Sequence, residues 1–221
     1  MTPVEVRAIL GELDRRLSAE LARFWHRLAE TSTSEFRDLV IAAYPELVTP
    51  YVSAAADLGA VWYDSQPSTN TRFSASPAEL PPVEKLQSSA SWALAVGNGD
   101  QAIALLTGSA ERALFDGLRD TVLDNVGREP GARWARHASA NACAFCRMLA
   151  TRGADYLRES TADFKSHDAC RCMAVPARPG QPLHEAPYVE EWRKQYQRAR
   201  SEAGSGDPKQ ILNAWNRLIN D

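Results

Sequence analysis

Residues 143–172 read CAFCRMLATRGADYLRESTADFKSHDACRC and contain all four cysteines of the 221-residue chain. The cysteines and one histidine follow the pattern C-x2-C-x20-H-x2-C-x-C. Thiols clustered in this way are more often metal ligands than disulfides when the protein is made in a reducing compartment. Around this stretch short apolar segments replace long helical ones. We therefore expect a helical body before it and a small α+β module around it.

The chain before the cysteines is predicted to be helical. Residues 3–28 place apolar side chains at steps of four and three, and Thr2-Pro3-Val4-Glu5 is a capping box with Pro at the first helical position. A second helix is expected after Ser32, with Pro45 and Pro50 interrupting or restarting it. Further helices are expected over residues 83–96 and 106–126.

The remaining elements are shorter. We expect strands over 134–139 and 170–175, the second ended by Pro176, and helices over 145–151, over 189–203 and after Pro208. The predicted fold class is mainly α: a helical N-terminal body, a small α+β cysteine-rich module and a helical C-terminal tail. The predicted organisation has five parts: an N-terminal helical segment (residues 1–65), a linker rich in Ser, Thr and Pro (66–82), a central helical segment (83–130), the cysteine-rich module (131–178) and the tail (179–221).

Composition excludes several classes of protein. Hydrophobic residues make up 44% of the chain and charged residues 24%, which is ordinary for a globular protein and excludes disorder throughout. No run approaches the roughly 20 apolar residues of a membrane-spanning helix, so no membrane contact is expected. Glu5, Arg7 and Glu12 stand where a signal peptide needs an apolar stretch, so we expect synthesis in a cytoplasm.

Charge is unevenly distributed along the chain. Residues 1–130 carry 11 Lys/Arg and 18 Asp/Glu, whereas residues 131–200 carry 12 and 7. An acidic front and a basic rear favour two parts with different partners, although the two parts would equally neutralise each other.

Five side chains are candidate metal ligands for four positions: Cys143, Cys146, His167, Cys170 and Cys172. Thiolates and an imidazole suit a structural Zn²⁺ held in a tetrahedron. The first four form the most regular set, and Cys172 either replaces His167 or faces away on the following strand. The alternative interpretation is four reduced thiols, or two disulfides formed after release from the cell.

The runs GARWARHASANACAFCRMLATRGADY and HDACRCMAVP resemble the C-terminal motif of MuF-like phage head morphogenesis proteins, also called minor head proteins. In that family a Cys-x-x-Cys is followed by His-x-x-Cys-x-Cys. The front run FRDLVIAAYPELVTPYVSAAADLGAVWYD and the later PYVEEWRKQY are similar to the actinobacteriophage branch. The resemblance extends from the first helix to Tyr196. The chain departs from many relatives in its short stretch between Cys146 and His167, where they carry a longer basic insertion.

The resemblance implies a structural protein of a tailed phage, carried in few copies inside the capsid or at the portal vertex. It implies roles in head assembly and in DNA packaging or ejection. The implied partners are the portal protein and, further, the major capsid protein and the packaged DNA. We therefore expect a virion protein that is made in the host bacterial cytoplasm.

Relatives in this branch are often labelled capsid maturation proteases, so a protease is the second hypothesis. The best base and nucleophile pair is His137 with Ser139, and it is weak. Neighbouring side chains on one face of a strand stand about 6.6 Å apart, which is long for a hydroxyl–imidazole hydrogen bond. No G-x-S-x-G or H-E-x-x-H motif is present. We assign no catalytic residue and expect no enzyme.

A zinc-stabilised module that contacts DNA is the third hypothesis. Basic residues surround the cysteines and would contact phosphates without reading base sequence. The same residues would equally pair with an acidic partner surface. The residues proposed for nucleic-acid or partner contact are Arg133, Arg136, Arg147, Arg152 and Arg171, with Lys165 and Arg178 nearby.

Overall fold

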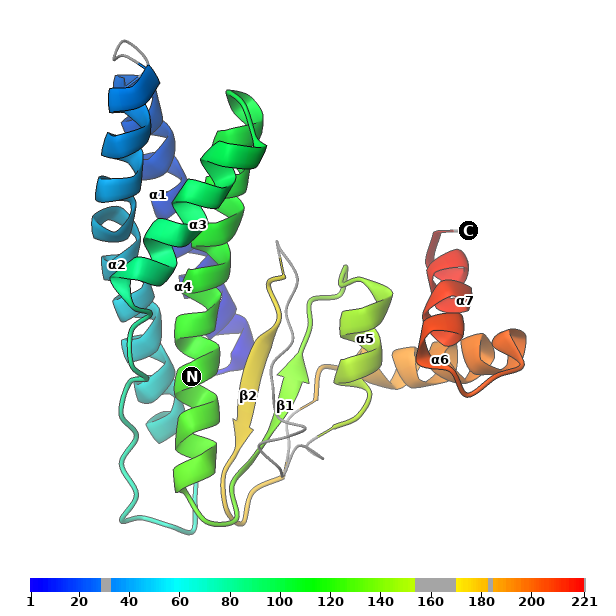
Figure 1. The fold of residues 1–221 in the computed structure, drawn as a ribbon. Coiled ribbons are helices and arrows are strands. Elements are labelled where there is room, and N and C mark those ends of the chain that lie inside the picture. The colour runs from blue at the N-terminus through cyan, green and yellow to red at the C-terminus, as the bar shows by residue number, and fades with distance from the viewer. Residues whose placement is uncertain (29–32, 154–169, 183–184, 221) are drawn as a thin grey trace. The chain divides into compact units, whose positions relative to one another are not determined.

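A computed structural model describes residues 1–28, 33–153, 170–182 and 185–220. Within these ranges the chain forms seven helices and one two-stranded sheet (Figure 1). The expected fold class, mainly α with a small α+β part near the cysteines, is confirmed.

The chain divides into two compact units, and neither is one continuous segment. Unit 1 comprises Met1–Ser65, Ser74–Asn125 and Phe164–Cys170. Unit 2 comprises Gln66–Phe73, Val126–Asp163 and Arg171–Asp221. The stretch expected as a linker, residues 66–82, is therefore shared between the two units.

Unit 1 is built from α1 (Pro3–Leu28), α2 (Thr33–Ser65), α3 (Val83–Val96) and most of α4 (Asp100–Arg128). The predicted capping box begins α1: the Thr2 amide donates to Glu5 Oε2 at 2.7 Å, and the Glu5 amide donates to Thr2 Oγ1 at 3.3 Å. The hydrogen bond from the Thr2 amide has the largest effect on the pKa of Glu5 and lowers it. The hydrogen bond from the Thr2 side chain lowers this pKa further. Val6, Leu10, Leu17 and Leu21 are buried, which gives α1 one apolar stripe toward the core.

Helix α2 runs unbroken through Pro45 and Pro50, so the expected interruption is wrong. Each proline removes one backbone donor from the helix. The buried stripe of Val40, Tyr44, Val48 and Val52 continues past both positions, and this packing offsets the lost bonds. Among the described helices, the segment Glu35–Ser65 of α2 is the one that is long and apolar enough to cross a membrane. Buried core helices meet the same criteria of length and composition.

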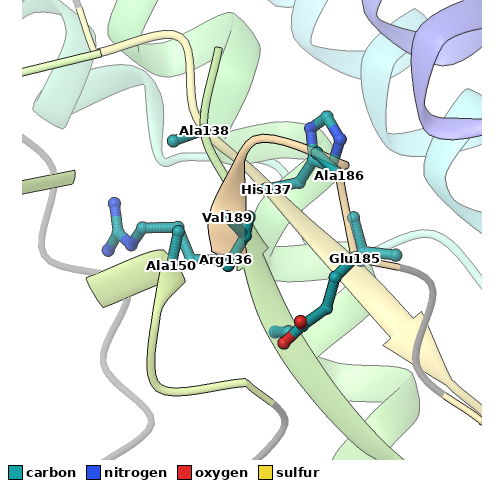
Figure 2. Close-up of a pocket in the computed structure, with 9 residues that line it drawn as sticks. Arg136, His137, Ala138, Ala150, Glu185, Ala186 and Val189 are labelled. Atoms are coloured by element: carbon teal, nitrogen blue, oxygen red, sulfur yellow. The ribbon is translucent and has the colours of Figure 1, made fainter. Parts of the chain in front are cut away.

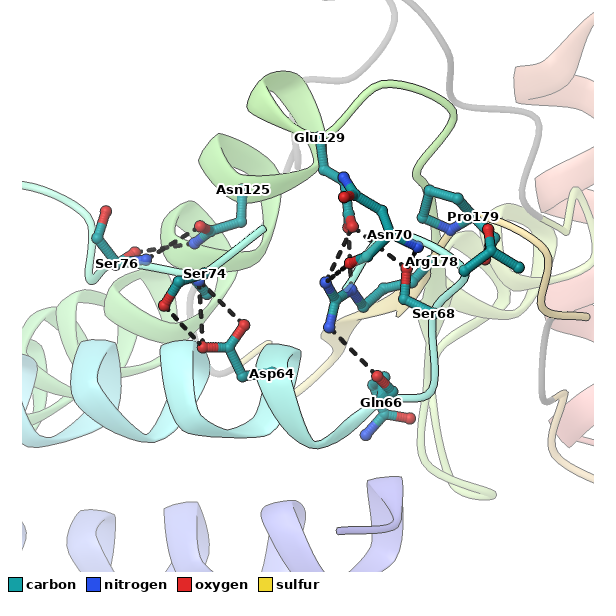
Figure 3. A network of polar contacts seen from close by, with 12 residues as sticks. Asp64, Gln66, Ser68, Asn70, Ser74, Ser76, Asn125, Glu129, Arg178 and Pro179 are labelled. Atoms are coloured by element: carbon teal, nitrogen blue, oxygen red, sulfur yellow. Dashed lines mark hydrogen bonds and ion pairs between the residues drawn. The ribbon is translucent and has the colours of Figure 1, made fainter. Parts of the chain in front are cut away.

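Helices α2 and α4 pack closely because glycines stand at their crossing. A Cβ added to Gly117 would lie 2.7 Å from the Val52 carbonyl oxygen, and one added to Gly59 would lie 3.0 Å from Thr121 Cβ. The extended segment after residue 73 is fixed to the same helices. The Asn125 amide bonds both backbone groups of Ser76, and Asp64 accepts from the Ala75 amide at 3.0 Å (Figure 3).

Unit 2 contains the antiparallel pair β1 (Arg133–His137) and β2 (Met173–Ala177), with α5 (Ala144–Ala150), α6 (Val189–Ala203) and α7 (Pro208–Asn220). Strand β2 starts later than expected and includes Pro176, which pairs with Trp134. A two-stranded sheet has only edge strands, so a residue without an amide donor is tolerated there. Gly204 ends α6 in a left-handed conformation, and Trp215 packs against Tyr196 at 5.8 Å between ring centres.

A buried ion pair joins Glu129, the residue after α4, to Arg178, the residue after β2. Arg178 donates to both carboxylate oxygens of Glu129 at 2.9 Å, and the two side chains are 5% and 0% exposed. The Arg178 guanidinium also donates to the carbonyl oxygens of Gln66 and Asn70, so the loop of residues 66–73 is fixed as part of unit 2 (Figure 3). We call this arrangement the Arg178–Glu129 clamp.

Candidate metal centre

Three cysteine side chains converge in the structure. Cys146 lies inside α5, and Cys170 and Cys172 come directly before β2. Their sulfur atoms all lie within 4.8 Å of one another, and the three residues are 2–5% exposed. Zn–S bonds of about 2.3 Å in a tetrahedron place sulfurs roughly 3.8 Å apart, so small side-chain adjustments would bring these thiols onto one ion.

The chemistry of the donor set fits a soft cation. None of the four cysteines forms a disulfide in the described structure, and three of them are buried together. Thiolate ligands select Zn²⁺ or another thiophilic metal over Mg²⁺ or Ca²⁺, which prefer oxygen. The group could therefore hold a metal ion, with a fourth ligand still to be supplied.

The group differs from the most regular set expected from the sequence. Cys143 is exposed and does not belong to the three-sulfur group, whereas Cys172 does. Cys143 precedes the first residue of α5 and has an extended backbone, with φ −64° and ψ 160°. A helix therefore replaces the tight turn that would aim both thiols of the first pair at one ion. His167 lies outside the described residues.

A buried arginine fixes the backbone of one of these cysteines within unit 1. Arg119 on α4 is 1% exposed, and its guanidinium donates to the Cys170 carbonyl oxygen. A second nitrogen of the same group donates to Asp116 Oδ1 at 2.7 Å. Sequence reasoning missed this role, because an arginine on a helix is usually at the surface.

The basic residues near the cysteines fall into two groups. Arg133, Arg152 and Arg171 are exposed. Arg136 is 4% exposed and therefore lies beneath the surface. Arg147 is half-buried, donates to the Ala142 carbonyl at 2.7 Å and lies 5.4 Å from the ring centre of Trp192. Arg178 belongs to the clamp, and Lys165 is outside the described residues.

His137 lines a small pocket at the end of β1 (Figure 2). The pocket has a volume of about 10 Å³, which is room for about one water molecule. Glu185 also lines it, but Figure 2 shows the carboxylate and the imidazole pointing in opposite directions, and the carboxylate bonds Arg193 instead. This pocket offers no space for a peptide beside the histidine.

Comparison with known proteins points to one family. The family model described as "VG15 protein" matches residues 3–199. A "Gene 15 protein" of Mycobacterium phage D29 is 30% identical over 64% of this chain and 58% of its own length. The chain thus spans little more than half the length of that curated relative. No solved structure matches.

Proposed function

The chain belongs to the VG15 protein family, and from that premise we propose that it is a structural protein of a tailed-bacteriophage head, located at or near the portal vertex. The observation that carries the proposal is the family match over residues 3–199, supported by identity to a phage gene product. The MuF-like pattern of cysteines adds the minor head role. The function is assembly: contact with portal protein and support of DNA packaging or ejection.

The architecture supports an assembly role. Helices α1, α2 and α4 have 26, 33 and 29 residues, and long helices offer extended faces for packing against partner helices. Asp14, Arg119 and Asn125 are buried, and the last two bond backbone carbonyls inside unit 1. These polar groups fix the conformation of the protein itself.

The test of the head role is the protein content of purified particles. Mass spectrometry should find the chain in virions at a few copies per particle, and cryo-electron microscopy should place it beside the portal. A phage with a stop codon in this gene should yield defective or empty heads, and the full-length chain supplied from a plasmid should restore them. Absence of the chain from purified particles would overturn the proposal.

The metal centre is proposed to hold a structural Zn²⁺. Cys146, Cys170 and Cys172 supply three thiolates, and His167 or Cys143 completes the site. Bound zinc would cross-link the segments that carry these thiols, and structural zinc in isolated peptides contributes on the order of 10 kcal/mol to folding.

Metal analysis of the reduced protein tests this site. We expect about one zinc per chain, and Co²⁺ substitution should give the thiolate charge-transfer absorption in the near ultraviolet. Cys146→Ser, Cys170→Ser and Cys172→Ser should each lower zinc content to well under half an equivalent. Cys143→Ser and His167→Ala identify the fourth ligand: the variant that loses zinc has lost that ligand, and the other variant keeps zinc. Wild-type protein with four titratable thiols and no zinc would refute the site.

Direct contact with DNA is a second proposal, favoured by the exposure of Arg133, Arg152 and Arg171 in unit 2. Retention on DNA should fall as salt rises, because phosphate contacts release counterions. Arg133→Ala combined with Arg171→Ala should weaken retention on all sequences alike. Unchanged retention in this variant would exclude these residues from DNA binding.

The protease hypothesis has its own test. Incubation with casein and with phage scaffold protein should leave both substrates intact. If cleavage is seen, His137→Ala decides whether the His137–Ser139 pair is responsible.

A further inference from the structure

Unit 1 has a groove that the metal centre does not use. It lies between α3 and α4 and has a volume of about 680 Å³. The lining residues come from both helices: Lys85, Ser88, Ser89, Trp92, Ala104, Leu105, Gly108, Ser109 and Arg112. We call this the α3–α4 groove. Its volume is many times that of the pocket beside His137.

Small side chains keep the groove open. Ser88 and Ser89 on α3 lie opposite Ala104, Gly108 and Ser109 on α4. A Cβ added to Gly108 meets no atom within 4 Å, so the space above this residue is empty. Gly117, nine residues later on the same helix, lies instead against the backbone of α2. Gly108 and Gly117 thus mark an unfilled side and a filled side of the helix.

Apolar surface is exposed at one end of the groove. Trp92 and Val96 are each 51% exposed and stand one helical turn apart on α3. The buried stripe of α3 is a different one, formed by Leu86, Ala90, Ala93 and Leu94. Helix α3 is therefore apolar on two sides, and only one is covered within unit 1. An exposed tryptophan beside an open groove is typical of a protein-binding site.

Two basic residues line the other end of the groove. Helices α3 and α4 are joined by residues 97–99 and run antiparallel, which places Lys85 opposite the Arg112 part of α4 and Trp92 opposite Leu105. None of the nine lining residues is acidic, although residues 1–130 carry 18 Asp/Glu against 11 Lys/Arg. The groove is thus lined by basic and apolar side chains, and Asp120, a carboxylate of α4 within electrostatic reach of Lys85, lies outside the lining.

We propose that the α3–α4 groove binds an amphipathic helix of another protein that carries carboxylates toward Lys85 and apolar side chains toward Trp92 and Leu105. Two neighbouring helices with small residues between them can bind a third helix in the groove, as in other helix-in-groove interfaces. The charge at one end and the tryptophan at the other fix the direction of the bound helix. This inference goes beyond the head role and does not depend on the metal.

Site-specific photo-cross-linking in infected cells tests the proposal. The full chain, with Ser88→p-benzoylphenylalanine, replaces the phage copy, and the cross-linked peptide is identified by mass spectrometry. The same label at Val61, which is 61% exposed on α2, is the matched control for an exposed position outside the groove. We expect a product at Ser88, absent at Val61, that joins a helical segment rich in Asp and Glu from a different protein.

Two further variants separate the contributions. Gly108→Leu fills the groove where the added side chain meets open space, and it should abolish the product while leaving the circular dichroism spectrum and melting temperature near wild type. Lys85→Glu should lower the product by about tenfold, because a like charge then faces the partner carboxylates. Lys209→Glu, an equal charge change at an exposed position of α7, should leave the amount of product unchanged.

Each outcome decides the assignment. A product with a second copy of this chain, with another part of the same chain, or with a segment lacking acidic residues would overturn it, as would equal products at Ser88 and Val61. An acidic helical partner, found together with absence of this chain from purified particles, would keep the groove assignment and overturn the head role. The two proposals can therefore fail separately.

Discussion

Removal of one partner of the Arg178–Glu129 clamp should destabilise unit 2 strongly. Glu129 is fully buried and Arg178 is 5% exposed, and two nitrogen–oxygen pairs stand at 2.9 Å. Glu129→Ala leaves a buried guanidinium without its carboxylate, which costs about 3–5 kcal/mol in comparable sites. With a urea m value of about 2 kcal/mol/M, the unfolding midpoint should fall by roughly 2 M.

The matched control is an ion pair of the same chemistry on the surface of the same unit. Arg217 and Glu202 are also 2.9 Å apart, but their side chains are 62% and 43% exposed. Glu202→Ala should change the free energy of unfolding by about 1 kcal/mol or less, because water screens the pair. The difference between the losses of unfolding free energy in Glu129→Ala and Glu202→Ala measures the effect of burying the ion pair.

A double variant, Glu129→Leu with Arg178→Met, separates the cost of the orphaned charge from the worth of the pair. It should recover much of the loss, although the Gln66 and Asn70 carbonyls lose their donor and each bond is worth about 1 kcal/mol. Urea unfolding followed by tryptophan fluorescence measures all three variants. If Glu129→Ala costs no more than Glu202→Ala, the clamp does not stabilise unit 2 and the reasoning is wrong.

Three further predictions concern other parts of the chain. Gly108→Ala should stabilise α4 by about 0.5–1 kcal/mol, whereas Gly117→Ala should destabilise it by about 1–3 kcal/mol because its Cβ would meet the Val52 carbonyl at 2.7 Å; thermal melts of both variants check the pair, and equal effects would contradict the packing. Burial, then the charges of Asp116 and Asp124, raise the pKa of Asp120 from 3.8 to about 6, so the folded state holds this proton more tightly than the unfolded state. Stability from this group is therefore present at acidic pH and is lost as pH rises from about 4 to 6; Asp120→Asn should gain melting temperature relative to wild type at pH 7 but not below pH 4, and a constant difference would refute the shift. Removal of metal with a chelator should lower the melting temperature of the wild type, and it should leave Cys146→Ser unaffected.

The sequence predicted the helices whose signals are local. The capping box at Thr2, the glycines after Val96 and the glycine at 204 mark element ends that the structure reproduces. The continuity of α2 could not be predicted in this way, because Pro45 and Pro50 are local stop signals and their neighbours gain stability only from tertiary burial.

The candidate site was predictable in composition but not in membership. Spacing marked five ligands, yet the start of α5 at Ala144 decides that Cys146 turns inward while Cys143 stays exposed. The burial of Arg136 and Arg178 could not be predicted from the sequence either. Arg136 and Arg178 look like the exposed Arg133 in sequence, and only the strand faces and the position of Glu129 distinguish them.

The order in which the ribosome delivers the chain has a consequence for the loop of residues 66–73. Arg178, which bonds the Gln66 carbonyl, is synthesised 112 residues later. At about 5–20 residues per second, the loop waits roughly 6–22 s for its partner to leave the exit tunnel. During translation the four helices of unit 1 are synthesised before Arg178. Until Arg178 emerges, the eight residues of the loop lack its hydrogen bonds to the Gln66 and Asn70 carbonyls. A nascent chain halted before Arg178 should therefore be cut by protease at this loop, and the released protein should resist.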